Sequence, residues 1–166
     1  MIAFSDLPDD VVRVKGQIYI VAPPLKVWQV LIDYNNHKNF IPNIIDSGTI
    51  SDQGDEKVVF ETGTIKMLIF KKQVSVQMKV WGEDFKHLNF KQIAGDFKVY
   101  QGEWILVEYP QGQGTFLTYY ADIKPDFFAS PLIVKGIEKR DCPLVLSAIK
   151  KKAESFYIIK PQDIIP

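Results

Sequence analysis

The last third of the chain limits most tightly what the protein can fold into. Residues 95–125 form a run with extended character, which breaks at residues 127–131 and is followed by one long amphipathic helix. Ser130 suits the N-cap of this helix and Pro131 suits its first turn, so we expect the helix to span about residues 130–156. Strands that end in one covering helix predict a sheet and a helix with room for a cavity between them.

The preceding two-thirds of the chain predict the rest of the sheet. Residues 11–21 are rich in β-branched side chains and predict a first strand, and two short helices follow, one to about residue 33 and one over 36–40. Further extended segments begin at residue 44 and then span 57–64, 73–81, 87–93, 97–107 and 115–123. The short turns between them predict an antiparallel meander. We therefore expect an α+β fold in which a curved antiparallel sheet of about seven strands wraps around the C-terminal helix.

Composition and charge exclude several classes of protein. The 166 residues are 46% hydrophobic and 13% aromatic, which suits a single domain over residues 1–166 with enough apolar side chains to line a pocket. Twenty basic and twenty acidic side chains cancel, so no net field favours nucleic acid or an anionic bilayer. The lone Cys142 and an N-terminus unlike a signal peptide lead us to expect a cytoplasmic location.

Strand alternation predicts which side chains face the interior. Trp104 and Tyr119 are the strongest candidates for contact with a ligand, because each has a polar group that can orient an amphipathic molecule. Plain core packing is the alternative for many of the inward positions. The complete set of predicted ligand-binding residues is Met78, Phe90, Tyr100, Trp104, Leu117 and Tyr119 from the sheet, with Ile133, Ile137 and Leu144 from the helix. We expect them to line a pocket of roughly 300–1,000 Å³.

Catalytic and metal-binding patterns are weak. His37 and His87 are about fifty residues apart, and neither has a cysteine or carboxylate at metal-ligand spacing, so we expect surface histidines, no metal and no cofactor. Glu61 and Glu103 lie on predicted strands, and either could act as a general base if burial raised its pKa. We expect both carboxylates to face solvent, and therefore assign no catalytic residue.

One short segment could touch a membrane transiently. Met67-Leu68-Ile69-Phe70 is apolar and is followed by Lys71-Lys72, which is the combination that interfacial segments use. The end of an ordinary strand explains the same pattern.

Several segments resemble a known superfamily. They lie at residues 27–36 and 40–42, and again at Gly95-Asp96-Phe97, Gly102-Glu103-Trp104, Leu117-Thr118-Tyr119 and Lys124-Pro125. Together with the order of the predicted elements, they resemble the START-like (SRPBCC) superfamily, specifically its polyketide cyclase/dehydrase and coenzyme Q-binding branch. The resemblance implies a helix-grip fold with an apolar tunnel under the C-terminal helix. Relatives use this tunnel for lipids, sterols, quinones, polyketides or plant hormones, and only some of them are enzymes.

The residues and the resemblance lead to one main functional expectation and two alternatives. We expect a protein that binds a hydrophobic or amphipathic small molecule, such as a lipid, an isoprenoid quinone or a polyketide-like compound, without catalysing a reaction. An aromatase/cyclase-type enzyme acting on a polyketide is the first alternative, and a protein-interaction module is the second. A strongly shifted acid in the cavity would favour the enzyme, and a large exposed apolar patch would favour the interaction module.

Overall fold

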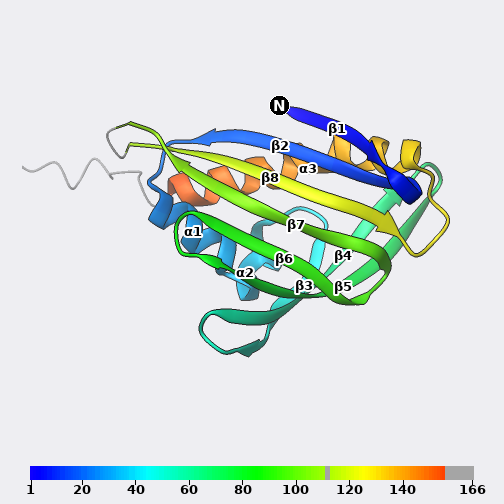
Figure 1. Cartoon of the computed structure of the whole chain (residues 1–166), viewed down its shortest axis with the longest axis horizontal. Helices are drawn as coiled ribbons and strands as arrows, with labels where there is room; N and C mark the ends of the chain where they lie inside the picture. Colours follow the sequence, from blue (N-terminus) through cyan, green and yellow to red (C-terminus); the bar gives the residue numbers. More distant parts are fainter. Residues whose placement is uncertain (111–112, 156–166) are drawn as a thin grey trace, which may run out of the picture.

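The computed structural model describes residues 1–110 and 113–155 and shows one antiparallel sheet around a long helix (Figure 1). Within these residues the sheet has eight strands in the order β1-β2-β8-β7-β6-β5-β4-β3. The strands are β1 (Ile2–Leu7), β2 (Val11–Ile20), β3 (Ile44–Asp52), β4 (Glu56–Met67), β5 (Phe70–Glu83), β6 (His87–Gly95), β7 (Phe97–Glu108) and β8 (Thr115–Pro125). The helices are α1 (Pro24–Ile32), α2 (Tyr34–Phe40) and α3 (Pro131–Glu154). The predicted α+β helix-grip fold is confirmed.

The first strand, β1, was not expected from the sequence. It pairs antiparallel with β2, from Ile2 opposite Gly16 to Leu7 opposite Val11. The turn between the two strands holds Asp9 and Asp10 at positive φ, which aspartate tolerates better than most residues. The sheet therefore has one strand more than predicted, because a short acidic segment next to a proline gives a weak strand pattern and is stabilised by its pairing partner.

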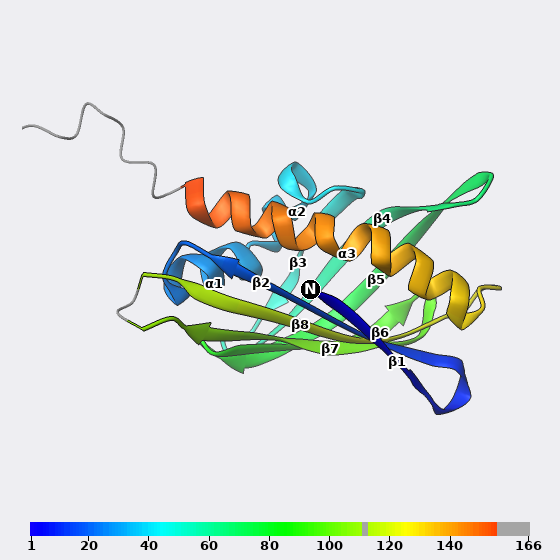
Figure 2. The same ribbon diagram turned by 90° about the horizontal axis from the view of Figure 1, so that it is seen from above.

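All three α-helices lie on one side of the curved sheet (Figure 2). The short helix α1 buries an apolar side formed by Val27, Trp28, Val30 and Leu31. The long helix α3 begins as predicted, since the Ser130 Oγ accepts a hydrogen bond from the Ile133 backbone N–H at 3.4 Å. No helix among the described residues is long and apolar enough to cross a membrane.

The face that α3 turns toward the sheet differs from the predicted one. The buried positions are Val134, Cys142, Leu146, Ile149 and Ala153. Leu144, which we expected to face the interior, is 46% exposed. This helix carries apolar residues on more than one side, so helical spacing alone allowed several apolar stripes.

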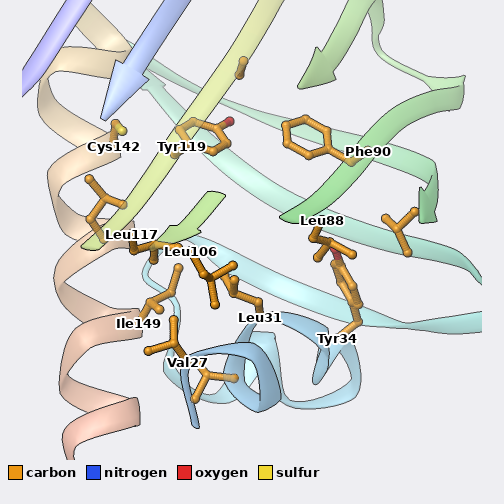
Figure 3. Close-up of a cluster of buried hydrophobic side chains, with 14 of the residues drawn as sticks. Val27, Leu31, Tyr34, Leu88, Phe90, Leu106, Leu117, Tyr119, Cys142 and Ile149 are labelled. Atoms are coloured by element: carbon orange, nitrogen blue, oxygen red, sulfur yellow. The ribbon is translucent and has the colours of Figure 1, made fainter. Parts of the chain in front are cut away.

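A packed core fills the end of the molecule where α1 meets α3. Figure 3 shows Leu117, Leu106 and Ile149 close to Val27 of α1. These four residues have between 0% and 5% of their surface exposed. Leu117 therefore belongs to the packed core, whereas the space that remains open lies further along α3, around Tyr119 and Cys142.

Candidate functional site

Two adjoining cavities lie between the sheet and the helices. The first, which we call the inner cavity, has a volume of about 170 Å³ and is walled by residues of the sheet, α2 and α3. Its lining includes Leu31, Tyr34, His37, Ile41, Met78, Phe90, Trp104, Tyr119, Cys142, Leu146 and Ile149.

The second, which we call the outer cavity, also measures about 170 Å³. It lies between β4, β5 and the first turns of α3, with Ile65, Val74, Phe127 and Ile137 among its lining residues. Both cavities share a wall formed by Ile44, Glu61, Tyr100, Glu138, Asp141 and Val145. Each cavity alone is smaller than the single pocket that we expected.

The predicted ligand-binding residues are distributed unevenly over these cavities. Ile137 lines the outer cavity, whereas Leu117, Ile133 and Leu144 line neither cavity. Leu117 is packed in the core and Leu144 faces solvent. The remaining predicted residues, Met78, Phe90, Tyr100, Trp104 and Tyr119, lie in the wall of the inner cavity.

An aromatic wall closes the sheet side of the inner cavity. The Trp104 and Tyr119 ring centroids are 4.5 Å apart, because these residues are directly opposite each other on β7 and β8. The Phe90 ring stacks on Tyr119 with centroids 6.0 Å apart and an interplanar angle of 12° (Figure 3). Gly102 is opposite Phe90 on β7, and a Cβ atom there would lie 1.9 Å from the Tyr120 carbonyl oxygen and 2.8 Å from the Phe90 ring. The glycine therefore allows the close approach of the β8 backbone and also leaves room for the Phe90 ring.

A buried histidine and a carboxylate, which also line the inner cavity, are hydrogen-bonded to each other. The His37 Nδ1 lies 2.7 Å from the Glu61 Oε1, and the His37 Nε2 lies 3.1 Å from the Val30 carbonyl oxygen. A carbonyl only accepts, so Nε2 carries a proton, and the Nδ1–Oε1 contact requires a second proton between the two groups. His37 is 6% exposed and the Glu61 side chain is 17% exposed. The expectations of a surface histidine and of a solvent-facing Glu61 were therefore wrong.

Three tyrosine hydroxyl groups remain neutral in this site. Burial raises the pKa of Tyr34, Tyr100 and Tyr119, and the negative charge of Glu61 raises the pKa of Tyr34 and Tyr100 further. The Tyr100 and Tyr119 side chains are also hydrogen-bonded to each other. Each hydroxyl can therefore donate or accept a hydrogen bond to a ligand without carrying charge.

Glu138 is the functional candidate that the sequence did not reveal. It projects from α3 into the wall shared by both cavities, and no hydrogen bond or ion pair links it to any other described residue. Burial, followed by the negative charge of Asp141, raises the pKa of Glu138 to about 7, although Arg140 opposes this shift. Its spacing of four residues from the buried Cys142 was the available signal, because it places a carboxylate within the buried stripe.

Two neighbours of Glu138 on α3, Asp141 and Cys142, are not expected to react: the first is ion-paired and the second has a raised pKa. Asp141 is held by Arg140 through Nε–Oδ1 and Nη2–Oδ2 contacts of 2.6 and 2.7 Å. Burial, and then the charge of Glu138, raises the pKa of the Cys142 thiol to about 12, so this thiol is not a reactive nucleophile.

The other predicted carboxylate, Glu103, lies away from the cavities. It is opposite Asn89 on β6 and Tyr120 on β8, and it borders a groove on the outer face of the sheet with Arg13 and Asp122. Among the described residues, no group of three or more His, Cys, Asp or Glu side chains is placed to hold a metal ion. The residues with acid or base side chains that line the cavities include Glu61, His37, Glu138, Asp141 and the tyrosines.

Solved structures share this architecture. The fold matches an aromatase/cyclase, Zhui, from Streptomyces sp. R1128, with a TM-score of 0.78 and 14% identity over 91% of this chain and 98% of that one. A START superfamily protein from Mycobacterium smegmatis gives a TM-score of 0.75 at 13% identity, covering 87% and 98% of the two chains. A STAR-related lipid transfer protein from Xanthomonas axonopodis gives 0.67 at 13% identity, covering 92% and 98%.

Sequence comparison identifies the family. No protein with a curated description matches the chain. A sequence model of the family described as polyketide cyclase / dehydrase and lipid transport matches residues 20–150, which span the site from α1 to the last turns of α3. This match confirms the resemblance drawn from the sequence segments, and the chain belongs to the polyketide cyclase / dehydrase and lipid transport family.

Proposed function

We propose that the protein binds a hydrophobic or amphipathic small molecule in the two cavities under α3. The observation that carries this proposal is the pair of adjoining, mainly apolar cavities with a few polar groups at their shared wall. The family description, which includes lipid transport, supports it. A lipid, an isoprenoid quinone or a polyketide-like compound has the required chemistry.

In this proposal the aromatic wall holds the apolar part of the ligand. Trp104, Tyr119 and Phe90 offer flat apolar surfaces at the inner cavity, and Ile137 contributes to the outer one. Tyr100 lines both cavities, and its hydroxyl group would bind a polar group of the ligand.

A larger side chain at the shared wall is expected to block binding. Val145 lines both cavities, so Val145→Phe should lower the affinity for an apolar fluorophore by about tenfold or more, by filling the space that the probe needs. Leu144→Phe is the matched control, because Leu144 is the preceding residue and faces solvent. Fluorescence titration measures the affinity, and thermal unfolding checks that both variants are folded.

Saturable binding that Val145→Phe removes and Leu144→Phe preserves is the expected result. The absence of saturable binding to the wild type, or equal affinity in both variants, would contradict ligand binding at this site. Native mass spectrometry of gently purified protein would identify a ligand that remains bound.

One observation favours a second candidate function, an enzyme of the aromatase/cyclase kind. Glu138 places an unpaired carboxyl group with a pKa of about 7 in the cavity wall, and a group that transfers protons works best with a pKa near the working pH. If the protein converts a polyketide-like substrate, Glu138→Gln should abolish turnover and leave the circular dichroism spectrum unchanged. Unaltered turnover in this variant would contradict a role for Glu138 as the acid or base.

We also propose that the hairpin between β4 and β5 touches a bilayer during uptake or release of the ligand. Its tip is apolar and open to solvent, with Leu68 102%, Ile69 95% and Phe70 56% exposed. The hairpin borders the outer cavity through Ile65, and the Arg140 Nη1 donates a hydrogen bond to the Lys66 carbonyl at 2.9 Å. The lysines at residues 66, 71 and 72 would favour an anionic surface.

Removing the apolar tip is expected to weaken contact with vesicles. The double substitution Leu68→Ser and Ile69→Ser should lower the amount that sediments with vesicles rich in anionic lipid by about tenfold, since two large apolar side chains no longer enter the interface. Ile93→Ser removes a comparably large apolar side chain, 55% exposed, from β6 and should have little effect. Equal sedimentation of both variants would rule out contact through this tip.

A further inference from the structure

Three carboxylate side chains mark the boundary between the two cavities. Glu61 from β4 and Glu138 and Asp141 from α3 each line both the inner and the outer cavity. We call these three residues the polar waist. On either side of it the walls are mainly apolar, with the aromatic wall in the inner cavity and Ile65, Val74, Phe127 and Ile137 in the outer one. A ligand that occupies both cavities must therefore pass the polar waist.

Two of the three carboxylates of the polar waist have a basic partner in the part of the chain that the structure describes, and the third does not. Glu61 is paired with His37, and Asp141 is paired with Arg140. Glu138 has no such partner among the described residues. The Arg140 side chain is 45% exposed and also donates a hydrogen bond to the Lys66 carbonyl. Its guanidinium group is therefore held at the protein surface by Asp141 and Lys66. No lysine or arginine lines either cavity in the described part of the chain.

We propose that the polar waist selects ligands whose polar group donates a hydrogen bond and carries no negative charge, such as an alcohol, a phenol or an amine, and that it excludes carboxylates and phosphates. This inference rests on the proposed binding function and specifies its ligand class. The apolar part of such a ligand would lie against the aromatic wall, and its hydroxyl or amine would reach Glu138.

The physical reason is the mismatch between an anion and this wall. Carboxylate oxygens only accept hydrogen bonds, so an anionic group at the waist would meet acceptors and like charge in a partly desolvated site. A buried charge without a partner is strongly unfavourable. A hydroxyl or an amine instead supplies the donor that Glu138 lacks. Selection therefore comes as much from exclusion of anions as from attraction of donors.

The preference should depend on pH through Glu138. Below its pKa of about 7 this carboxyl group is neutral and can both donate and accept, and above that pH it is an anion. The other titratable or charged groups that line the cavities are His37 and Tyr34 from α2, Glu61, Tyr100 and Tyr119 from the sheet, and Asp141 and Cys142 from α3, with Arg140 beyond Asp141. Exclusion of an anionic ligand should thus strengthen as the pH rises through 7.

A matched set of ten-carbon probes tests this selection. Decanol, decylamine and decanoate share the same apolar chain and differ only in the polar group. Each competes with a bound apolar fluorophore at pH values about one unit below and one unit above the pKa of Glu138. At the higher pH, the affinities for decanol and decylamine should exceed the affinity for decanoate by about tenfold or more.

Two variants test whether the polar waist is responsible for this selection. Glu138→Gln keeps the size of the side chain and one acceptor oxygen, replaces the other oxygen by an NH2 donor and removes the charge. It should raise the affinity for decanoate at the higher pH by about fivefold or more, remove most of the pH dependence and leave decanol within about twofold. Glu103→Gln, on the outer face of the sheet, removes the same charge away from the cavities and should leave every affinity unchanged.

The outcomes separate this inference from the function on which it rests. If the fluorophore does not bind the wild type, the proposed binding function fails and the selection fails with it. If the fluorophore binds but decanoate competes as well as decanol, or Glu138→Gln leaves their ratio unchanged, the selection alone is overturned. Preference for the donor probes that depends on Glu138 supports it.

Discussion

Glu138→Gln is expected to raise the free energy of unfolding by about 3 kcal/mol at about pH 8 and to change it little at about pH 4. In the native protein the pKa of Glu138 is raised from 4.5 to about 7, mainly by burial. Ionising the carboxylate in the folded state therefore costs more than in the unfolded chain. Glutamine avoids this cost, because it carries no charge at any pH.

The pH window of this effect follows from the two pKa values. Below 4.5 both the folded and the unfolded state hold the proton, so Glu138 makes no pH-dependent contribution. Between 4.5 and about 7 the unfolded state releases its proton first, and the stability of the wild type falls as the pH rises. Above about pH 7 the carboxyl group is ionised in both states, and the wild type keeps the full loss of stability.

Urea unfolding of the wild type and the variant across this pH range measures the difference. Glu103→Gln serves as the control, since Glu103 lies outside the cavities and should give no pH-dependent difference. A difference between wild type and Glu138→Gln that is constant over the whole range would mean that Glu138 ionises like an ordinary surface carboxylate. The raised pKa and the pH dependence inferred for ligand selection would then both fail.

Two substitutions in neighbouring strands should separate stability from binding, since one mainly destabilises the fold and the other mainly weakens ligand binding. Leu117→Ala should lower the free energy of unfolding by about 2–5 kcal/mol, because Leu117 is 0% exposed and its loss leaves a hole in the packed core. Its effect on ligand affinity should be small, since it lines neither cavity.

Trp104→Ala should instead cost less than the roughly 3–5 kcal/mol typical of a large aromatic residue in a packed core. The ring is half-buried and already borders the open inner cavity, so fewer packing contacts disappear with it. Affinity for an apolar fluorophore should fall by about tenfold, because the stacking surface beside Tyr119 is lost.

Chemical denaturation and fluorophore titration on the same preparations compare the two variants. If Trp104→Ala destabilises the protein as much as Leu117→Ala and leaves binding intact, Trp104 is a core residue and the inner cavity is not the binding site.

Local patterns in the sequence were sufficient for the antiparallel meander from β3 to β8, the start of α3 and the inward-facing aromatic residues. A strand alternates its side chains between two faces, so Tyr100 and Trp104 had to share the face of the sheet that meets the helices. Ser130 and Pro131 mark a helix start through contacts within one turn. These features depend on neighbours a few residues apart, which is why they could be predicted without a structure.

Other features depend on residues that are distant in the sequence. Strand β1 exists because β2 supplies its hydrogen-bonding partners. The orientation of α3 was decided by which of several apolar sides could pack against the sheet, and this choice turned Leu144 to solvent and Glu138 inward. Local periodicity does not distinguish these sides, because each has a similar apolar content.

The polar contacts of the site also depend on residues that are distant in the sequence, so local patterns did not predict them. His37 and Glu61 lie 24 residues apart, and only the packing of α2 against β3 and β4 brings their side chains to 2.7 Å. We expected Glu61 to face solvent. In the structure it shares a face of β4 with the buried Val59, two residues before it, and its partner and its burial follow from the tertiary structure. The chemistry of the cavities, unlike the meander from β3 to β8, is therefore set by long-range contacts, because burial and charge pairing form only when distant elements meet.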